Sequence, residues 1–255
     1  MSPRPIARVM FVTPFLLLPL LGACARPYVT PARGVALSSL TTADSDIAER
    51  MLRQPAAEFP ARIALVRVQS PGYRSYSREG YGSGNYSVVT TREIETDEDI
   101  QRLERLPMIS QTTMLNRMVI PVELRSDREL RLAASTLKAD LLLAYSVDTS
   151  FRIDEHDVGP LRLITLGMAP TKEAIVTATA SLALIDVRTG YVFALAEGTA
   201  REKQLASSWT RCDAVEESRL RAERHAFRKM LDEFEAAWKG VVEQYASRQA
   251  ALTPS

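Results

Sequence analysis

The feature that most restricts the fold is a strand pair followed by a long helix in the C-terminal half. Residues 173–200, "EAIVTATASLALIDVRTGYVFALAEGTA", form two runs rich in apolar and β-branched residues, separated by Arg188, Thr189 and Gly190. Gly190 can adopt the positive φ that a tight turn requires. Residues 212–245 then repeat apolar residues at intervals of three and four among many charges, which predicts an amphipathic helix packed on the sheet, with a coiled-coil seam as the alternative. The apolar positions are Leu220, Phe227, Leu231, Phe234, Trp238, Val241 and Tyr245.

Further strand and helix patterns precede this unit. Residues 62–70, "RIALVRVQS", and residues 139–151, "ADLLLAYSVDTSF", have few polar positions and predict interior strands. Thr96 is placed to cap a helix that ends at Pro107, and Ser126 with Glu129 forms a capping-box pattern. The predicted helices cover residues 44–53, 97–106 and 127–138. Together these elements predict a mixed β-sheet covered by helices, an α/β or α+β sandwich with a long C-terminal amphipathic helix. We expect a single domain over residues 44–248 and a disordered tail over 249–255.

The segments between these elements have less regular patterns. Residues 88–94 are polar and β-branched, and we expect a strand there after a long surface loop. Gly80, Gly82 and Gly84 predict a flexible loop, because no lysine or helix follows that would make a phosphate site. We expect a helical stretch through Met114 and Leu115, then an extended piece over residues 119–124.

The N-terminus has the three-part layout of an export signal. A basic start with Arg4 and Arg8 precedes the apolar residues 9–21, a run too short to span a ~30 Å hydrocarbon layer. The sequence Leu-Gly-Ala-Cys at residues 21–24 resembles the lipobox of bacterial lipoproteins. The resemblance implies that residues 1–23 are removed as a signal peptide and that Cys24 is acylated as the new N-terminus. Residues 24–43 would then be a tether; the alternative is an ordinary signal peptide in which Cys24 is incidental.

An acylated Cys24 implies a protein tethered to a membrane by several hydrocarbon tails. Ala25 after the cysteine favours the periplasmic face of the outer membrane, if the cell has two membranes. The formal net charge of +1 shows no electrostatic footprint for nucleic acid. Cys212 would be the only remaining thiol, which excludes an intrachain disulfide framework and a cysteine zinc site. We expect Cys212 to be buried, with an intermolecular disulfide as the alternative.

The order of the predicted elements resembles the periplasmic domain of the curli-secretion lipoprotein family. The same plan occurs in lipoprotein activators of penicillin-binding proteins and in an exopolysaccharide-export lipoprotein. The resemblance rests on Ala139 and Asp140 at the start of one strand and on the Asp-Val-x-Thr-Gly motif at residues 186–190. It implies an envelope protein partner and allows a homo-oligomer or a secretion-channel subunit. We disfavour the channel, because residues 86–96 place polar side chains on both faces of the expected strand.

Few residues indicate catalysis. Asp154, Glu155, His156 and Asp157 offer oxygen and nitrogen donors, yet consecutive residues of an extended chain point in opposite directions, so a solvated loop is favoured over a metal site. The only other histidine is His225, and no Gly-x-Ser-x-Gly elbow is present. We therefore expect no enzyme, cofactor or metal. The alternative, an envelope enzyme acting on glycan or peptide, requires Asp154, His156 and a distant carboxylate to converge.

Four tyrosines in one glycine-rich and serine-rich stretch suggest a binding surface. Tyrosines with small polar neighbours make adaptable contacts, and here they are Tyr73, Tyr76, Tyr81 and Tyr86. One hypothesis is that they contact a partner protein or cell-wall glycan; the other is that they pack on their own domain. The leading hypothesis is a non-enzymatic assembly, adaptor or accessory module, anchored to the cell envelope.

Overall fold

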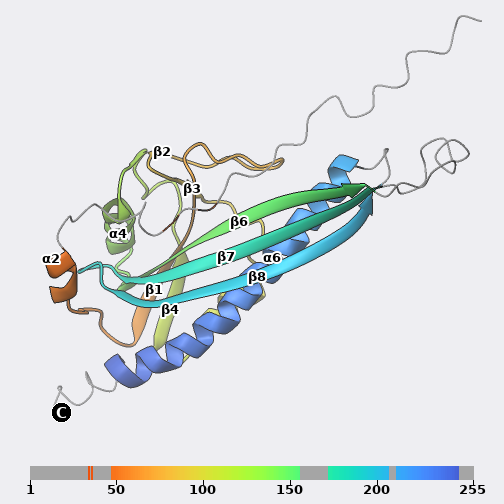
Figure 1. Cartoon of the computed structure of the whole chain (residues 1–255). Coiled ribbons are helices and arrows are strands. Elements are labelled where there is room, and N and C mark those ends of the chain that lie inside the picture. Colours follow the sequence, from red (N-terminus) through yellow and green to blue (C-terminus); the bar gives the residue numbers. More distant parts are fainter. Residues whose placement is uncertain (1–33, 35, 37–46, 156–171, 207–210, 247–255) are drawn as a thin grey trace, which may run out of the picture.

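A mixed six-stranded sheet forms the centre of the computed structural model, which describes residues 34, 36, 47–155, 172–206 and 211–246 (Figure 1). The strand order is β3-β1-β6-β7-β8, and β4 pairs with the first part of β1. β1 is parallel to β4 and β6, whereas β6, β7 and β8 are antiparallel. The bounds are β1 Ala61–Gln69, β3 Ser87–Val89, β4 Ile109–Met114, β6 Leu141–Glu155, β7 Lys172–Asp186 and β8 Val192–Ala206. The expected α+β class with a mixed sheet is confirmed.

The turn between β7 and β8 has the predicted geometry. Gly190 has a φ of 73°, and its N–H donates to the Asp186 carbonyl at 2.9 Å. The Asp186 carboxylate accepts the N–H groups of Arg188 and Thr189 at 2.8 and 3.0 Å. The Asp-Val-x-Thr-Gly motif therefore stabilises its own turn.

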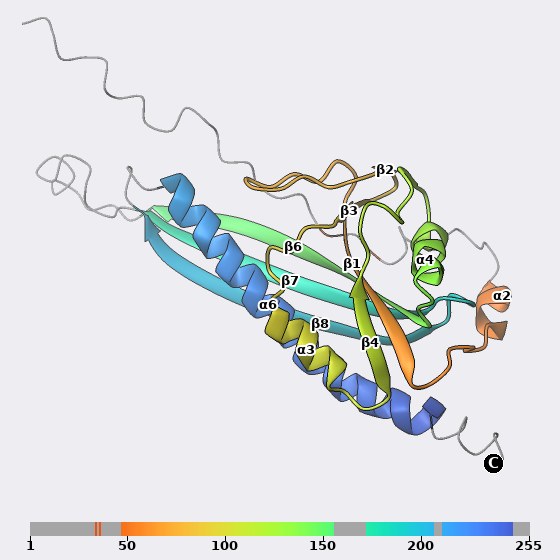
Figure 2. The ribbon, with the colours of Figure 1, turned by 180° about the vertical axis from the view of Figure 1, so that it is seen from behind.

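The long C-terminal helix α6, Arg211–Val241, covers one face of the sheet and continues into the π-helical turn η1, Val242–Ala246 (Figures 1 and 2). Its apolar side packs on β6, β7 and β8, as the spacing predicted. Ala196, Gly198 and Ala200 lie on the same face of β8 and let the helix approach closely. A Cβ atom at Gly198 would lie 2.3 Å from Met230 N, so the helix rests directly on the strand backbone. Within the described ranges, no helix has the length and apolarity needed to cross a membrane.

Two capped helices lie beside the sheet. α3, Asp97–Glu104, has Thr96 as its N-cap and lies along α6, where Arg102 Nη2 is 2.6 Å from Asp232 (Figure 2). α4, Asp127–Thr136, begins with the predicted Ser126 capping box and covers the opposite face near β1 and β6. The short helix α2, Ile47–Leu52, precedes β1.

The prediction of helix at Met114 and Leu115 was wrong. Met114 ends β4, which pairs in parallel with β1, and the Leu115 N–H donates to the Leu65 carbonyl at 2.9 Å. Pairing with a distant strand therefore overrides the local apolar pattern. The expected strand over residues 88–94 is shorter, because β3 ends at Val89. Of the extended piece over residues 119–124, only β5, Glu123–Leu124, is strand.

The glycine-rich stretch is part of a small second sheet. β2, Ser83–Gly84, pairs in parallel with β5. Gly84 has a φ of 120°, and a Cβ atom there would lie 2.4 Å from the Leu124 carbonyl oxygen. Gly84 therefore serves a close approach of two backbones, and the expectation of a flexible loop was wrong at this position.

Candidate functional site

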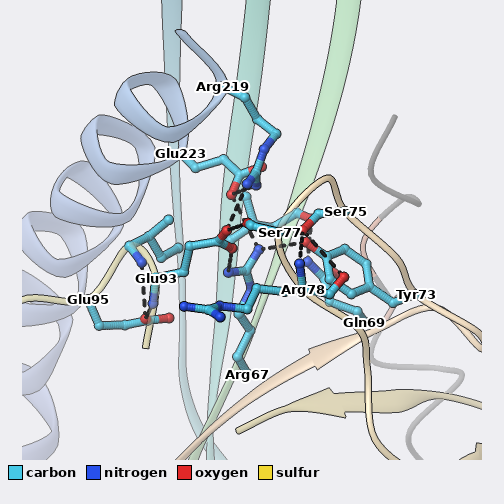
Figure 3. Close-up of polar contacts among 12 residues, drawn as sticks. Arg67, Gln69, Tyr73, Ser75, Ser77, Arg78, Glu93, Glu95, Arg219 and Glu223 are labelled. Atoms are coloured by element: carbon cyan, nitrogen blue, oxygen red, sulfur yellow. Dashed lines mark hydrogen bonds and ion pairs between the residues drawn. The ribbon is translucent and has the colours of Figure 1, made fainter. Parts of the chain in front are cut away.

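Charged side chains meet in the interior where the chain segment of residues 70–95, β1 and α6 come together (Figure 3). Arg219 and Glu223 are 0% exposed and Arg67 is 1% exposed, so these charges are removed from water. Burial of this kind is unfavourable unless the charges are paired and hydrogen-bonded. We call this group the charged cluster; its members are Arg67, Glu93, Glu216, Arg219 and Glu223, and the hydroxyl of the exposed Ser77 is bonded to it.

Local structure explains how each part of the chain supplies its side chain. Arg67 shares a face of β1 with Ile63 and Leu65, which belong to the core beneath α6. The helical residues Glu216, Arg219 and Glu223 stand three and four positions apart on α6, so they project from one side of the helix. Glu93 follows β3 and is supplied by the 70–95 segment.

Arg219 is the most highly connected residue of the charged cluster. Its guanidinium donates to both oxygens of Glu216, with Nε 2.9 Å from Oε2 and Nη2 2.7 Å from Oε1. Nη1 lies 2.8 Å from Glu223 Oε2, and Nη2 also lies 2.9 Å from Glu93 Oε1. Burial lowers the pKa of Arg219, but its hydrogen bond to Glu216 and the charges of Glu223, Glu93 and Glu216 together outweigh burial and raise the pKa above its ordinary value. Arg219 is therefore a permanent cation.

Arg67 approaches the same carboxylates from the sheet. Its Nη2 is 3.3 Å from Glu223 Oε2, and its Nη1 is 3.7 Å from Glu93 Oε2. The guanidinium carbon lies 5.7 Å from the centre of the Tyr73 ring, within the range of a cation–π contact. Burial lowers the pKa of Arg67, yet Glu223 together with Tyr73, Glu95 and Tyr145 more than compensates, and the net shift is upward.

Glu93 connects the 70–95 segment to both arginines. Ser77 Oγ donates to Glu93 Oε1 and lies 3.3 Å from Glu216 Oε1. Burial raises the pKa of Glu93. The Arg219 guanidinium, the Ser77 hydroxyl and Arg67 together lower it by more, so the pKa is below its usual value. An ionised Glu93 therefore links Ser77, which precedes β3, to Arg219 on α6.

Two further contacts extend the charged cluster into the sheet. Thr149 on β6 donates to Glu223 Oε1 at 2.8 Å, so both oxygens of Glu223 have partners. Tyr145, also on β6, donates to Glu95, whose other oxygen accepts its neighbours' backbone N–H groups.

Within the described side chains, no group of histidines, cysteines and carboxylates has the arrangement of a metal site. The geometry supports a clamp that joins β1, β6, α6 and the 70–95 segment.

The predicted tyrosine surface is wrong for two of its four members. Tyr73 is 1% exposed against Arg67, and Tyr86 is 0% exposed, with its hydroxyl donating to the Ser126 carbonyl at 2.7 Å. Both phenols lie in the interior because polar partners are available there. Tyr76 is 43% exposed and Tyr81 is half-buried, so their role in binding a partner stays a prediction.

Other predicted site residues fall outside the described part of the structure. Cys24, His156 and Asp157 lie in ranges that are not described. Asp154 lies in β6 and Cys212 lies in α6, but the structure describes only the backbone of these two residues. His225 is exposed and lies 2.8 Å from Glu202 Oε1.

Sequence reasoning missed the charged cluster. One signal was present, since Arg67 interrupts the apolar run "RIALVRV" at a position that alternation directs inward. The helical members Glu216, Arg219 and Glu223 resemble a solvated charged face in sequence. Only their contact with Arg67 and Glu93 distinguishes them from such a face.

Comparison with known proteins identifies no family. No family model matches the chain, and no curated protein matches it. One similar solved structure is that of a protein assigned as a homolog of the neuraminyllactose-binding hemagglutinin, from Helicobacter pylori. It has 10% sequence identity and a TM-score of 0.35, and the match covers 78% of this chain and 94% of that one. A similarity of this size carries no argument about fold or function.

Proposed function

We propose that the chain is a lipid-anchored protein of the bacterial cell envelope whose domain acts as a non-enzymatic assembly or adaptor module. The observation that carries the adaptor role is the clamping of the 70–95 segment by the charged cluster. Ser77 is bonded to Glu93 and lies 3.3 Å from Glu216, while its neighbour Tyr76 is 43% exposed. A segment that is ordered before binding loses less conformational entropy on binding. The 70–95 segment is therefore suited to present Tyr76 to a partner protein.

The anchor is proposed from the lipobox-like sequence at residues 21–24. Acylation of Cys24 would keep the domain at one membrane surface, where its partner would also reside. In a two-membrane cell this surface is the periplasmic face of the outer membrane. Metabolic labelling with a fatty-acid probe tests this step, because Cys24→Ala should abolish labelling of the chain. Equal labelling of the wild type and Cys24→Ala would overturn the anchor.

Site-specific photocrosslinking in intact cells tests the adaptor role. A photoreactive amino acid at Tyr76 should give a discrete adduct with an envelope protein. The same amino acid at Leu195, which is 63% exposed on β8, serves as the matched control. An adduct that forms at Tyr76 and not at Leu195 supports the proposal. If Tyr76 and Tyr81 both give no protein adduct, the adaptor surface is not the 70–95 segment, and cell-wall glycan becomes the contact to examine.

A further inference from the structure

The short helix α2 exposes an unusual amount of apolar surface. Ile47, Met51 and Leu52 are 77%, 78% and 77% exposed, although each is a large apolar side chain. Contact of such side chains with water is unfavourable, and apolar groups clustered on one element mark a surface that something else covers. Ile47 and Met51 are four positions apart and therefore lie on the same side of the helix. Leu52 is next to Met51 in the chain.

The chain that follows α2 is fixed to the folded domain. The N–H groups of Ala56 and Ala57 donate to Asp186 Oδ2 at 2.6 and 2.7 Å. In addition, a Cβ atom at Gly190 would lie only 3.2 Å from Arg53 Nη1. The β7–β8 turn thus fixes the chain directly after α2, so that the helix starts from a defined point on the domain.

Basic side chains accompany the apolar ones. Arg50 lies in the last turn of α2, and Arg53 follows directly after it. Arg188 is half exposed nearby, but its Nη2 lies 3.4 Å from Glu58 and 3.5 Å from Asp140, so its charge is already paired. Apolar and cationic side chains together suit the boundary between acyl chains and anionic headgroups, where apolar groups enter about 5–10 Å and cations remain at the surface.

We propose that α2 lies on the lipid surface that holds the anchor, with Ile47, Met51 and Leu52 among the acyl chains. This inference rests on the proposed acylation of Cys24. Three side chains offer far less area than the ~800 Å² that each partner buries in a standard protein interface. A membrane does not need that area, because residues 25–46 alone separate α2 from the anchor and the tether keeps the effective concentration of lipid high.

Fluorescence quenching by lipids with brominated acyl chains tests the inference. The full acylated chain, carrying Cys212→Ser and either Ile47→Cys or Met51→Cys, is labelled with an environment-sensitive fluorophore. It is then reconstituted into vesicles of phosphatidylethanolamine and brominated phosphatidylglycerol. Insertion at the acyl boundary should reduce the emission at both positions by about twofold or more. The matched control is Arg201→Cys, an exposed position toward the opposite end of β8 from the turn, where the emission should not change.

The outcomes separate the inference from the anchor on which it rests. Labels at positions 47 and 51 that match the control, on chains that float with the vesicles, would overturn the membrane contact of α2 and leave the anchor intact. This is also the result expected if α2 binds a protein, because the vesicles contain none. Chains that do not float with the vesicles would overturn the anchor, and the inference with it.

Discussion

Arg67 on β1 and Glu223 on α6 are 156 positions apart in the chain, yet Arg67 Nη2 lies 3.3 Å from Glu223 Oε2 in the interior. Glu223 also accepts hydrogen bonds from Arg219 and from Thr149 on β6. One carboxylate therefore joins two strands and a helix. Because the desolvation of these charges opposes their attraction, the charged cluster is better understood as a device that specifies one arrangement than as a large source of stability.

Removing the charge of Glu223 should destabilise the fold strongly. Glu223→Gln leaves Arg67 and Arg219 buried beside a neutral amide, and breaking a buried pair in this way costs about 3–5 kcal/mol. Chemical denaturation followed by circular dichroism measures the loss. Glu79→Gln is the matched control, since the pair of Arg74 and Glu79 is 70% exposed on both sides and should change stability by less than about 1 kcal/mol. Equal effects of the two substitutions would contradict a buried ion network.

The acid limb of the stability curve should depend on Glu93. Its pKa in the folded protein is below its ordinary value of 4.5, because the pull of Arg219 and its other partners exceeds the effect of burial. In the window between the two pKa values the unfolded chain binds more protons, so stability rises with pH there. The stabilisation by Glu93 is therefore complete above about pH 5 and is lost as the pH falls through the folded pKa. Unfolding measured between pH 7 and pH 3 should show a shallower acid decline for Glu93→Gln; an unchanged slope would contradict this assignment.

Three buried phenols should ionise late in alkaline titration. Burial raises the pKa of Tyr73, Tyr86 and Tyr145 above the ordinary value of 10, most clearly for Tyr145, where the charge of Glu95 adds to it. Phenolate absorbance near 295 nm should therefore appear in two stages in the folded protein and in one stage in guanidinium chloride. Tyr145→Phe should remove part of the late stage. Above about pH 10 the unfolded chain loses these protons first, so stability should fall as the pH rises.

The close contact between α6 and β8 predicts opposite results for two glycines. A Cβ atom at Gly198 would lie 2.3 Å from Met230 N and 2.5 Å from Ala226 O, and neither backbone atom can move without shifting the helix. Gly198→Ala should destabilise the protein by about 1–3 kcal/mol. Gly240→Ala is the control, because no atom lies within 4 Å of its added Cβ and alanine is the better helix former by about 1 kcal/mol. Thermal unfolding should therefore shift down for the first substitution and up for the second.

Much of the architecture could be predicted because its signals are local. The N-cap at Thr96, the capping box at Ser126 and the turn at Gly190 each depend on residues a few positions apart, and the structure confirms all three. The apolar spacing of α6 was equally informative, because an amphipathic helix is stabilised by burying its apolar stripe, and here that stripe packs on the sheet. Where the partner was distant in sequence, prediction was less successful, as β4 shows.

The amino-acid sequence by itself determined the class of fold, the order of most elements and the helix boundaries set by caps, because periodicity and capping act over a few residues. Tertiary structure alone decided which tyrosines of the 70–95 segment are buried and which charges of α6 face the core. Tyr73 is buried because its ring contacts the Arg67 guanidinium from β1. Arg219 is buried because it forms ion pairs with Glu93 and Glu223. These polar side chains are buried where residues far away in the sequence supply their hydrogen-bond and charge partners. Such contacts form only when the chain folds, so local sequence patterns do not reveal them.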